Sequence, residues 1–153
     1  MNTQIQFEWS AVFDKSIEIC QEDENYLNYS ARERMLAFVF TFLQTIGVDE
    51  QKFSGLLKQQ RIPFLNNSQL EELKHAFNNY TNALVFEGTN SGEIQARPFI
   101  ANYYKQLLWN AFLSILYFWA NDKSDHKENP FTLHLIYWHQ TPLIREWIWC
   151  SIF

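Results

Sequence analysis

The sequence has few of the residues that interrupt regular secondary structure. Its 153 residues include only 4 glycines and 4 prolines. Because a fold of many short strands needs frequent turns, this shortage favours a few long helices. The only cysteines are Cys20 and Cys150, and no secretory leader follows Met1. We therefore expect reduced thiols and a cytoplasmic location rather than a disulfide-bonded secreted domain.

The chain also lacks an excess of positive charge. Its 12 Lys and Arg against 17 Asp and Glu give a formal net charge of −5. A domain that binds nucleic acid by itself normally carries a stripe of basic residues, so we expect no direct nucleic-acid binding by this chain. The longest apolar stretch, residues 106–120, is shorter than the ~20 residues that a membrane-spanning helix needs, and Lys105 blocks its extension.

Motifs for catalysis and metal binding are missing as well. No serine stands in a Gly-x-Ser-x-Gly motif, and neither cysteine has a recognisable nucleophile context. Glu72 and His75 have the Glu-x-x-His spacing of di-iron bundles, but such a site needs a second motif and two more carboxylates. An exposed helix edge is the simpler interpretation. His134 and His139 have no paired cysteines beside them. We expect no enzyme, no metal site and no cofactor.

The sequence is rich in apolar and aromatic residues, and one long segment concentrates them. Aromatic residues make up 18% of the chain. Pro98 opens a stretch that reaches Asn121 without another proline or glycine. Proline suits the first turn of a helix, so we predict a helix from Pro98 to Ala120. From Leu107 onward its apolar side chains lie on every side, so a second copy or a bound apolar molecule is expected to complete its cover.

Two helices are predicted in the first third of the chain. Residues 4–21 place apolar side chains at mostly helical spacing. Ser30 and Glu33 form a capping box, in which the serine oxygen accepts from the Glu33 N–H and the glutamate reaches back. This box opens the second helix, which Gly47 is expected to end. The expected buried positions of the first helix are Phe7, Val12, Phe13, Ile17 and Cys20.

Further patterns predict two helices in the middle of the chain. A short one covers residues 49–60, and a second capping box, Ser68 with Glu71, opens a longer one. A turn-rich loop at residues 87–93 follows it. The fold class is therefore predicted to be all-α, a bundle of about five to six helices over residues 1–129. Residues 130–153 are an atypical Trp-rich C-terminal segment, with a last helix packing on the same domain as one interpretation. The stripe of the longer helix is Leu70, Leu73, Phe77, Tyr80 and Leu84.

Three segments, residues 29–34, 88–99 and 103–109, resemble one group of C-terminal domains in tetracycline-repressor-like (TetR-like) transcription regulators. Gly88-Thr89-Asn90-Ser91-Gly92-Glu93-Ile94-Gln95-Ala96-Arg97-Pro98-Phe99 is similar to the junction before the long helix of those domains. Residues 29–34 and 103–109 are also similar, and the likeness in order and spacing extends over residues 26–127. The resemblance implies an all-α homodimeric domain that encloses a mostly apolar small molecule. It also implies that the long and terminal helices of both subunits form a four-helix bundle.

Two features depart from the family pattern. Before Tyr26 the sequence shows no helix-turn-helix, so we expect this chain to lack the family's DNA-binding unit. After Asn129, Pro142 and several tryptophans stand where the family has a regular terminal helix, which bears on the usual dimer interface. We hypothesise a shortened or frame-altered member of the family. Flanking coding DNA without an upstream helix-turn-helix in any frame would count against this hypothesis.

Two sets of residues are candidates for function. Large aromatic side chains at helical spacing suit an apolar pocket, although each also suits a core position. Asn110 is the candidate polar anchor, because an amide among apolar neighbours needs a partner, which could also lie on a neighbouring helix or another subunit. One face of the long helix is assigned to a dimer interface, with packing inside the subunit as the alternative. The ligand-binding candidates are Phe38, Phe42, Phe77, Tyr80, Tyr103, Trp109 and Asn110; the dimer-interface candidates are Leu108, Phe112, Ile115 and Trp119.

The function expected from the resemblance is that of an effector-sensing and dimerisation domain. It binds an apolar small molecule and has no DNA-binding unit of its own. The alternative is a small carrier for lipid-like ligands whose Trp-rich tail rests on a membrane surface. Co-sedimentation with liposomes distinguishes the two functions, because only the carrier is expected to bind strongly through its tail.

Overall fold

The computed structural model describes residues 2–58, 68–95 and 101–123, and these residues form five α-helices and two short 3-10 helices with no strand. The predicted all-α fold class is confirmed. The C-terminal segment 130–153, with Pro142, His134 and His139, lies outside the described residues, as does the predicted helix start at Pro98. The elements in order are α1 (Asn2–Gln21), η1 (Tyr26–Asn28), α2 (Ala31–Gly47), α3 (Glu50–Lys58), η2 (Ser68–Leu70), α4 (Glu71–Ser91) and α5 (Ala101–Asn121).

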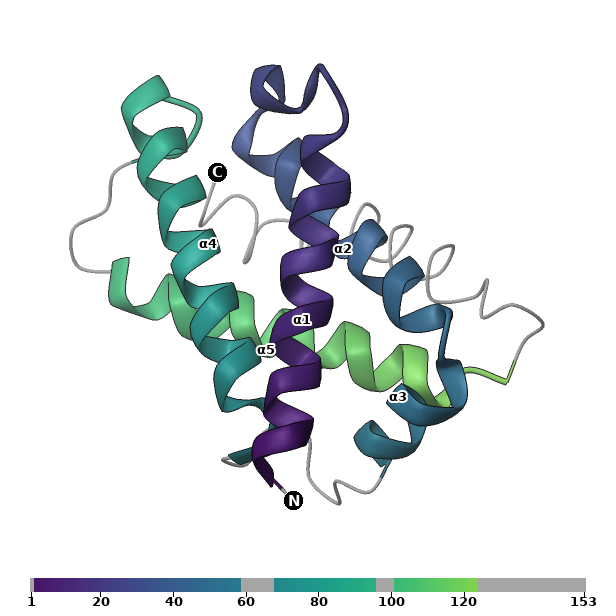
Figure 1. The fold of residues 1–153 in the computed structure, drawn as a ribbon. Helices are drawn as coiled ribbons and strands as arrows, with labels where there is room; N and C mark the ends of the chain where they lie inside the picture. The colour runs from purple at the N-terminus through teal and green to yellow at the C-terminus, as the bar shows by residue number, and fades with distance from the viewer. Residues whose placement is uncertain (1, 59–67, 96–100, 124–153) are drawn as a thin grey trace.

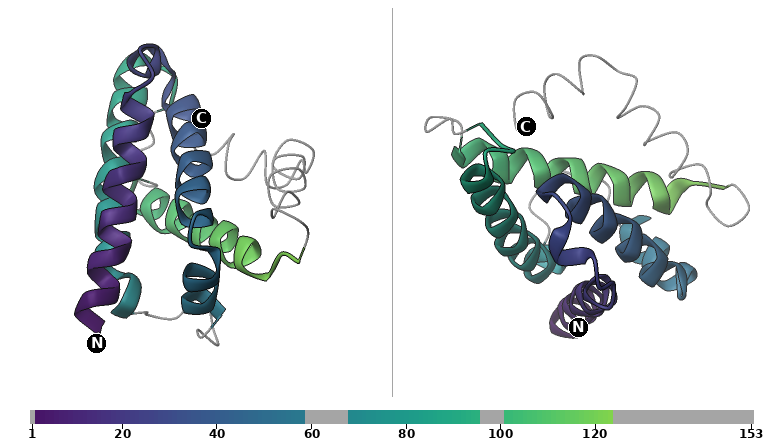
Figure 2. Two further views of the ribbon diagram at one scale, coloured as in Figure 1. Left: turned by 45° about the vertical axis from the view of Figure 1, so that its right-hand side comes forward. Right: turned by 90° about the horizontal axis from the view of Figure 1, so that it is seen from above.

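The helices are arranged in three layers (Figures 1 and 2). α1 packs along α2 and α4, and these two helices separate it from α5. α5 crosses behind α2 and α4 and also packs against α3. The middle layer therefore contributes side chains to both of its neighbours, and the hydrophobic core runs from α1 through α2 and α4 to α5.

The first two helices lie close to their predicted positions. α1 begins slightly before the predicted residue 4, and it buries Trp9, Phe13, Ser16 and Cys20, which recur every three or four residues. The predicted capping box of α2 is present: the Ser30 Oγ accepts from the Glu33 N–H, and the Glu33 carboxylate accepts from the Ser30 N–H. The hydrogen bonds that the Ser30 N–H and the Ser30 hydroxyl donate to the Glu33 carboxylate lower the pKa of Glu33. α2 ends at Gly47, as predicted.

Both ends of α4 differ from the prediction. The predicted capping box of Ser68 and Glu71 does not open this helix, because Ser68 lies in η2 and the N-cap is Leu70, which makes no side-chain capping bond. The predicted loop at residues 87–93 is also wrong at its start, because α4 continues to Ser91. Gly92 ends the helix with φ of +80°, a conformation that glycine adopts without strain. Gly88, although it lies in a turn-rich segment of the sequence, is therefore inside the helix and does not begin a loop.

The stripe predicted for α4 faces the core. Leu70, Leu73, Phe77 and Leu84 are buried, and Tyr80 packs against them. Gly88 continues this stripe by one more turn, because it lies four residues after Leu84 and is itself buried. α3 buries Phe53 and Leu57, while Leu56 is half-buried.

Candidate functional site

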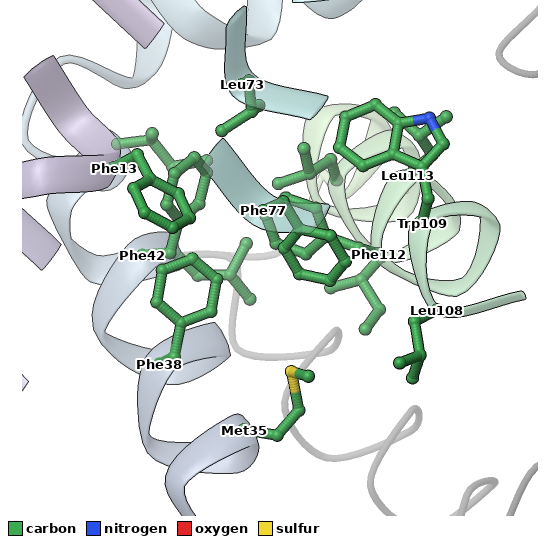
Figure 3. Packing of buried hydrophobic residues seen from close by; sticks show 14 of the residues in the cluster. Phe13, Met35, Phe38, Phe42, Leu73, Phe77, Leu108, Trp109, Phe112 and Leu113 are labelled. Atoms are coloured by element: carbon green, nitrogen blue, oxygen red, sulfur yellow. The ribbon is translucent and has the colours of Figure 1, made fainter. Parts of the chain in front are cut away.

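An aromatic cluster fills the space between α2, α4 and α5 (Figure 3). The rings of Phe77 and Phe112 stack with centroids 4.5 Å apart and planes 6° apart. Phe112 also meets Phe42 edge-on at 5.2 Å, and Phe38 at 5.9 Å. Trp109 lies 5.8 Å from Phe77. Separations of about 4.5–7 Å in stacked or tilted geometry are the favourable ones for aromatic pairs, so these five rings form one continuous packed network.

Tyr80 forms the polar edge of this cluster. Its ring lies 5.0 Å from that of Phe38, and its hydroxyl donates to the Arg34 carbonyl at 3.1 Å. The Tyr26 hydroxyl lies 2.8 Å from the Tyr80 hydroxyl. Burial, followed by the hydrogen bond with Tyr26, raises the pKa of Tyr80 well above its ordinary value. Burial also raises the pKa of Tyr26. Both hydroxyls therefore stay protonated at neutral pH and remain hydrogen-bonded to each other.

The structure brings five of the seven predicted ligand-binding residues together. Tyr103 belongs to α5, but the position of its side chain is outside the described part of the chain. Asn110 is half-buried, and its amide oxygen accepts from the Gln106 side chain at 2.8 Å. It lies roughly opposite the rings of the aromatic cluster, because it follows Trp109 by one residue and precedes Phe112 by two on a helix of about 3.6 residues per turn. The five that meet are Phe38, Phe42, Phe77, Tyr80 and Trp109.

The four predicted dimer-interface residues lie on the inner side of α5. Each is at most 8% exposed in the single chain. Phe112 belongs to the aromatic cluster, since its ring contacts those of Phe77 and Phe42. The two alternatives for this face were a dimer interface and packing inside the subunit. The contacts that the structure describes for it are contacts inside the subunit. The other three residues are Leu108, Ile115 and Trp119.

The opposite side of α5 is the one left uncovered by the described helices. Tyr117 and Phe118 are 42% and 41% exposed, although both are large and apolar. The neighbouring positions on the same side are half-buried and include small residues. We call this side the outward face of α5; it consists of Leu107, Asn110, Ala111, Ser114, Tyr117 and Phe118.

Trp9 was not among the residues predicted to be buried in the first helix. Its side chain has no exposed surface, whereas the predicted Val12 and Ile17 are half-buried and the side chain of Phe7 lies outside the described part of the chain. The Trp9 ring lies 4.9 Å from that of Phe53 and is nearly parallel to that of Phe42 at 6.3 Å. The buried residues Trp9, Phe13, Ser16 and Cys20 follow helical spacing more closely than the predicted set does. Ser16 and Cys20 are small, and Ser16 is polar, so the hydrophobic pattern of the sequence did not reveal this stripe.

The junction between α4 and α5 is tied to the start of α2. The Glu93 carboxylate accepts from the Ala31 N–H at 2.8 Å and from the Arg32 N–H at 3.2 Å. The third N–H of α2, that of Glu33, donates to Ser30. The first N–H groups of a helix have no partner within it, so here two side chains, one of them distant in the sequence, satisfy all three. A negative charge also complements the positive end of the helix dipole.

Arg34 adds a second connection between α2 and α4. Its guanidinium donates to the Glu87 carboxylate at 2.6 Å and to the carbonyl oxygens of Tyr29 and Leu27 at 3.0 and 3.1 Å. The Arg34 side chain is 18% exposed, so solvent screens this ion pair less than it screens a fully exposed pair. Together with Glu93, Arg34 fixes the position of α2 relative to the C-terminal end of α4.

We expect Glu93→Ala to lower the free energy of unfolding by about 1–2 kcal/mol, the usual effect of removing an N-terminal cap. The measurement is urea unfolding followed by circular dichroism. Glu18→Ala is the matched control, because the Glu18 side chain forms an exposed ion pair with Lys15 and its loss should change stability by less than about 0.5 kcal/mol. Equal effects of the two substitutions would show that Glu93 does not cap α2.

Within residues 2–58, 68–95 and 101–123, no three His, Cys, Asp or Glu side chains lie together as metal ligands. Glu72 and His75 are exposed on α4, where the His75 Nδ1 lies 3.3 Å from the Asn79 amide nitrogen. Cys20 is buried as a free thiol that donates to the Thr41 hydroxyl at 3.4 Å, and burial raises its pKa. No helix in the described part of the chain is apolar over enough residues to cross a membrane.

The described helices, with their aromatic cluster, form an all-α domain. The family described as "Tetracyclin repressor-like, C-terminal domain" matches residues 34–134, which is more than half of the chain. The protein belongs to this family of effector-binding and dimerisation domains, which are generally not enzymes. No curated protein and no solved structure gives a significant match.

The structure gives the glycine-containing junction of this chain, residues 88–99, a physical explanation as far as Gln95, the last described residue before α5. The resemblance of residues 88–99 to this family was a prediction from the sequence, and the family match confirms it. Each of four residues in that segment has a distinct structural role. Gly88 allows Ile94 to pack on α4, Gly92 adopts the left-handed turn, Glu93 caps α2, and Ile94 is buried.

Proposed function

We propose that this domain senses an apolar small molecule through its aromatic cluster and pairs with a second copy through the outward face of α5. The observation that carries the proposal is the ring network of α2, α4 and α5 around Phe112. A ligand that separates or replaces ring contacts in this network changes how α5 packs on α2 and α4. Such a ligand favours one helix arrangement over another, which is how binding can be transmitted to a regulatory partner.

The polar groups of the cluster suit an uncharged ligand. The Tyr26 and Tyr80 hydroxyls bond to each other, and Arg34 is engaged by Glu87 and two carbonyl oxygens. The tyrosine hydroxyls are uncharged and the Arg34 charge is paired with Glu87, so neither offers an unpaired charge to a ligand among the aromatic rings. Apolar walls with a few placed polar groups are typical of small-molecule sites.

The outward face of α5 is our proposed subunit interface. Tyr117 and Phe118 are exposed large side chains of α5, and Ala111 and Ser114 beside them are small enough for a second helix to approach. On this arrangement, Leu108, Ile115 and Trp119 support the interface from the inner side of the helix. Asn110 then lies where an amide can hydrogen-bond across the subunit boundary.

The proposal includes no direct contact of this chain with nucleic acid. Its net charge is −5, whereas nucleic-acid-binding domains typically carry a basic patch. α1 packs on α2 and α4 as part of the same helical domain, so it does not form a separate DNA-binding unit. We place the domain in the cytoplasm, where a free buried thiol such as Cys20 stays reduced.

Native mass spectrometry of the purified chain tests both parts of the proposal. We expect the mass of two chains together with a bound apolar small molecule, which is released and identified on activation. Tyr117→Glu combined with Phe118→Glu should give a single chain, because each charge would have to be buried between subunits. Phe86→Glu is the control: Phe86 is 67% exposed on α4, and this variant should remain a dimer.

Two results would count against the proposal. A wild-type protein that is a single chain at all concentrations would remove the interface on α5. A protein that carries no small molecule, and takes up none from a panel of apolar compounds, would remove the sensing function.

A further inference from the structure

Trp9 extends the aromatic cluster from α5 to α1. Its side chain has no exposed surface, and its ring contacts Phe53 of α3 and Phe42 of α2. Phe42 in turn contacts Phe112. Trp9 is therefore connected through a single ring to the centre of the proposed ligand site.

The indole N–H of Trp9 has no hydrogen-bond acceptor among the residues that the structure describes. A buried donor without an acceptor costs about 1–3 kcal/mol of stability. The tyrosine hydroxyls at the edge of the cluster are satisfied, since Tyr26, Tyr80 and the Arg34 carbonyl bond to one another. Trp9 thus differs from them in offering a free donor inside an apolar environment.

The surroundings of this donor favour an uncharged acceptor. The neighbouring charges, Glu8 and Lys52, form an ion pair with each other at 3.0 Å, and the Lys52 ammonium lies 5.5 Å above the Phe53 ring. They balance one another and stay partly exposed to solvent. The indole N–H can only donate. A carbonyl or ether oxygen on an aromatic skeleton matches both the donor and the ring walls, whereas a carboxylate would be buried without a cation.

We propose that the Trp9 indole N–H is the hydrogen-bond donor that orients the effector, and that the effector is a planar aromatic molecule with an uncharged oxygen acceptor. This inference rests on the proposed sensing function, because it assigns the ligand class and a specificity-determining residue to the same cluster. The ring walls provide affinity that depends on apolar area. The N–H distinguishes molecules of equal shape by the presence of an acceptor.

The matched probes are fluorene and 9-fluorenone, which share one tricyclic skeleton and differ by a CH₂ group against a carbonyl. Binding to the full chain is measured by calorimetry. We expect 9-fluorenone to bind about 3- to 10-fold more tightly, the range that one net hydrogen bond provides. Trp9→Phe should bind both probes equally. Incorporation of 3-benzothienylalanine at position 9 keeps the bicyclic shape without the N–H and should also remove the preference, so a folding defect cannot imitate the result.

A spectroscopic measurement reports on the donor directly. In protein labelled with ¹⁵N-tryptophan, the Trp9 indole resonance is assigned by its loss in Trp9→Phe. We expect its proton to shift downfield when 9-fluorenone is added and to shift less with fluorene.

The outcomes separate this inference from the function on which it rests. Equal affinity of the wild type for both probes, or a preference that persists without the indole N–H, overturns the role of Trp9 and leaves apolar sensing intact. A Trp9 resonance that does not respond to 9-fluorenone, as expected if only water bonds to the N–H, overturns it as well. Failure of both probes to bind up to their solubility limits overturns the ligand class, and an empty protein in native mass spectrometry additionally overturns the sensing function.

Discussion

Phe112→Ala is expected to lower the free energy of unfolding by about 3–5 kcal/mol, the cost of removing a large aromatic side chain from a packed core. Phe112 is 2% exposed and contacts rings from both α2 and α4. Neighbouring rings held in place by three helices cannot easily close the resulting cavity. Chemical unfolding at several protein concentrations measures the effect and separates subunit stability from association.

Phe86→Ala is the matched control for this prediction. Phe86 is 67% exposed, so its loss should change stability by at most about 0.5 kcal/mol. The comparison also tests the dimer-interface alternative for Phe112. If Phe112→Ala dissociated the dimer while the subunit stayed as stable as in Phe86→Ala, Phe112 would belong to the interface and not to the subunit core.

Gly88→Val is expected to lower the free energy of unfolding by about 1–3 kcal/mol, the usual cost of overfilling a core. A Cβ atom at position 88 would lie 2.7 Å from Cδ1 and 2.9 Å from Cγ1 of Ile94, and 3.2 Å from the Ala31 Cβ. Ile94 is buried, so it cannot move aside without disturbing the junction. Glu93 directly precedes Ile94 and caps α2, so a displaced Ile94 should also weaken this cap. We therefore expect the substitution to reduce the helical content around residue 31. Thermal unfolding and hydrogen exchange measure the two effects.

Gly55→Ala is the control, because Gly55 is also inside a helix, but a Cβ atom added there would meet no described atom within 4 Å. The helical preference of alanine over glycine should then stabilise the protein by about 0.5–1 kcal/mol. Opposite signs for the two glycines would support close packing as the role of Gly88. A stabilising Gly88→Val would contradict it.

Some of the functional assignments required the tertiary structure. The segments around Ser30 and the stripe of α4 were predictable because capping chemistry and helical spacing are local properties. The continuation of α4 past Gly88 was not predictable, since the contact of that glycine with Ile94 and Ala31 depends on how the chain folds back. The orientation of α5 was also ambiguous. A helix with apolar residues on every side has no polar face to show which side is inner.

The sequence alone determined that the chain is all-α, that it belongs with TetR-like regulatory domains and that its aromatic residues gather at helical spacing. These properties follow from periodicity, capping residues and a short junction motif. Only the tertiary structure decided which side of α5 faces the core, that Trp9 joins the aromatic cluster with an indole N–H that no described residue accepts from, and that Glu93 caps α2. Each of these depends on contacts between residues far apart in the chain, and local sequence patterns contain no information on which distant partner completes a helix end or covers a ring.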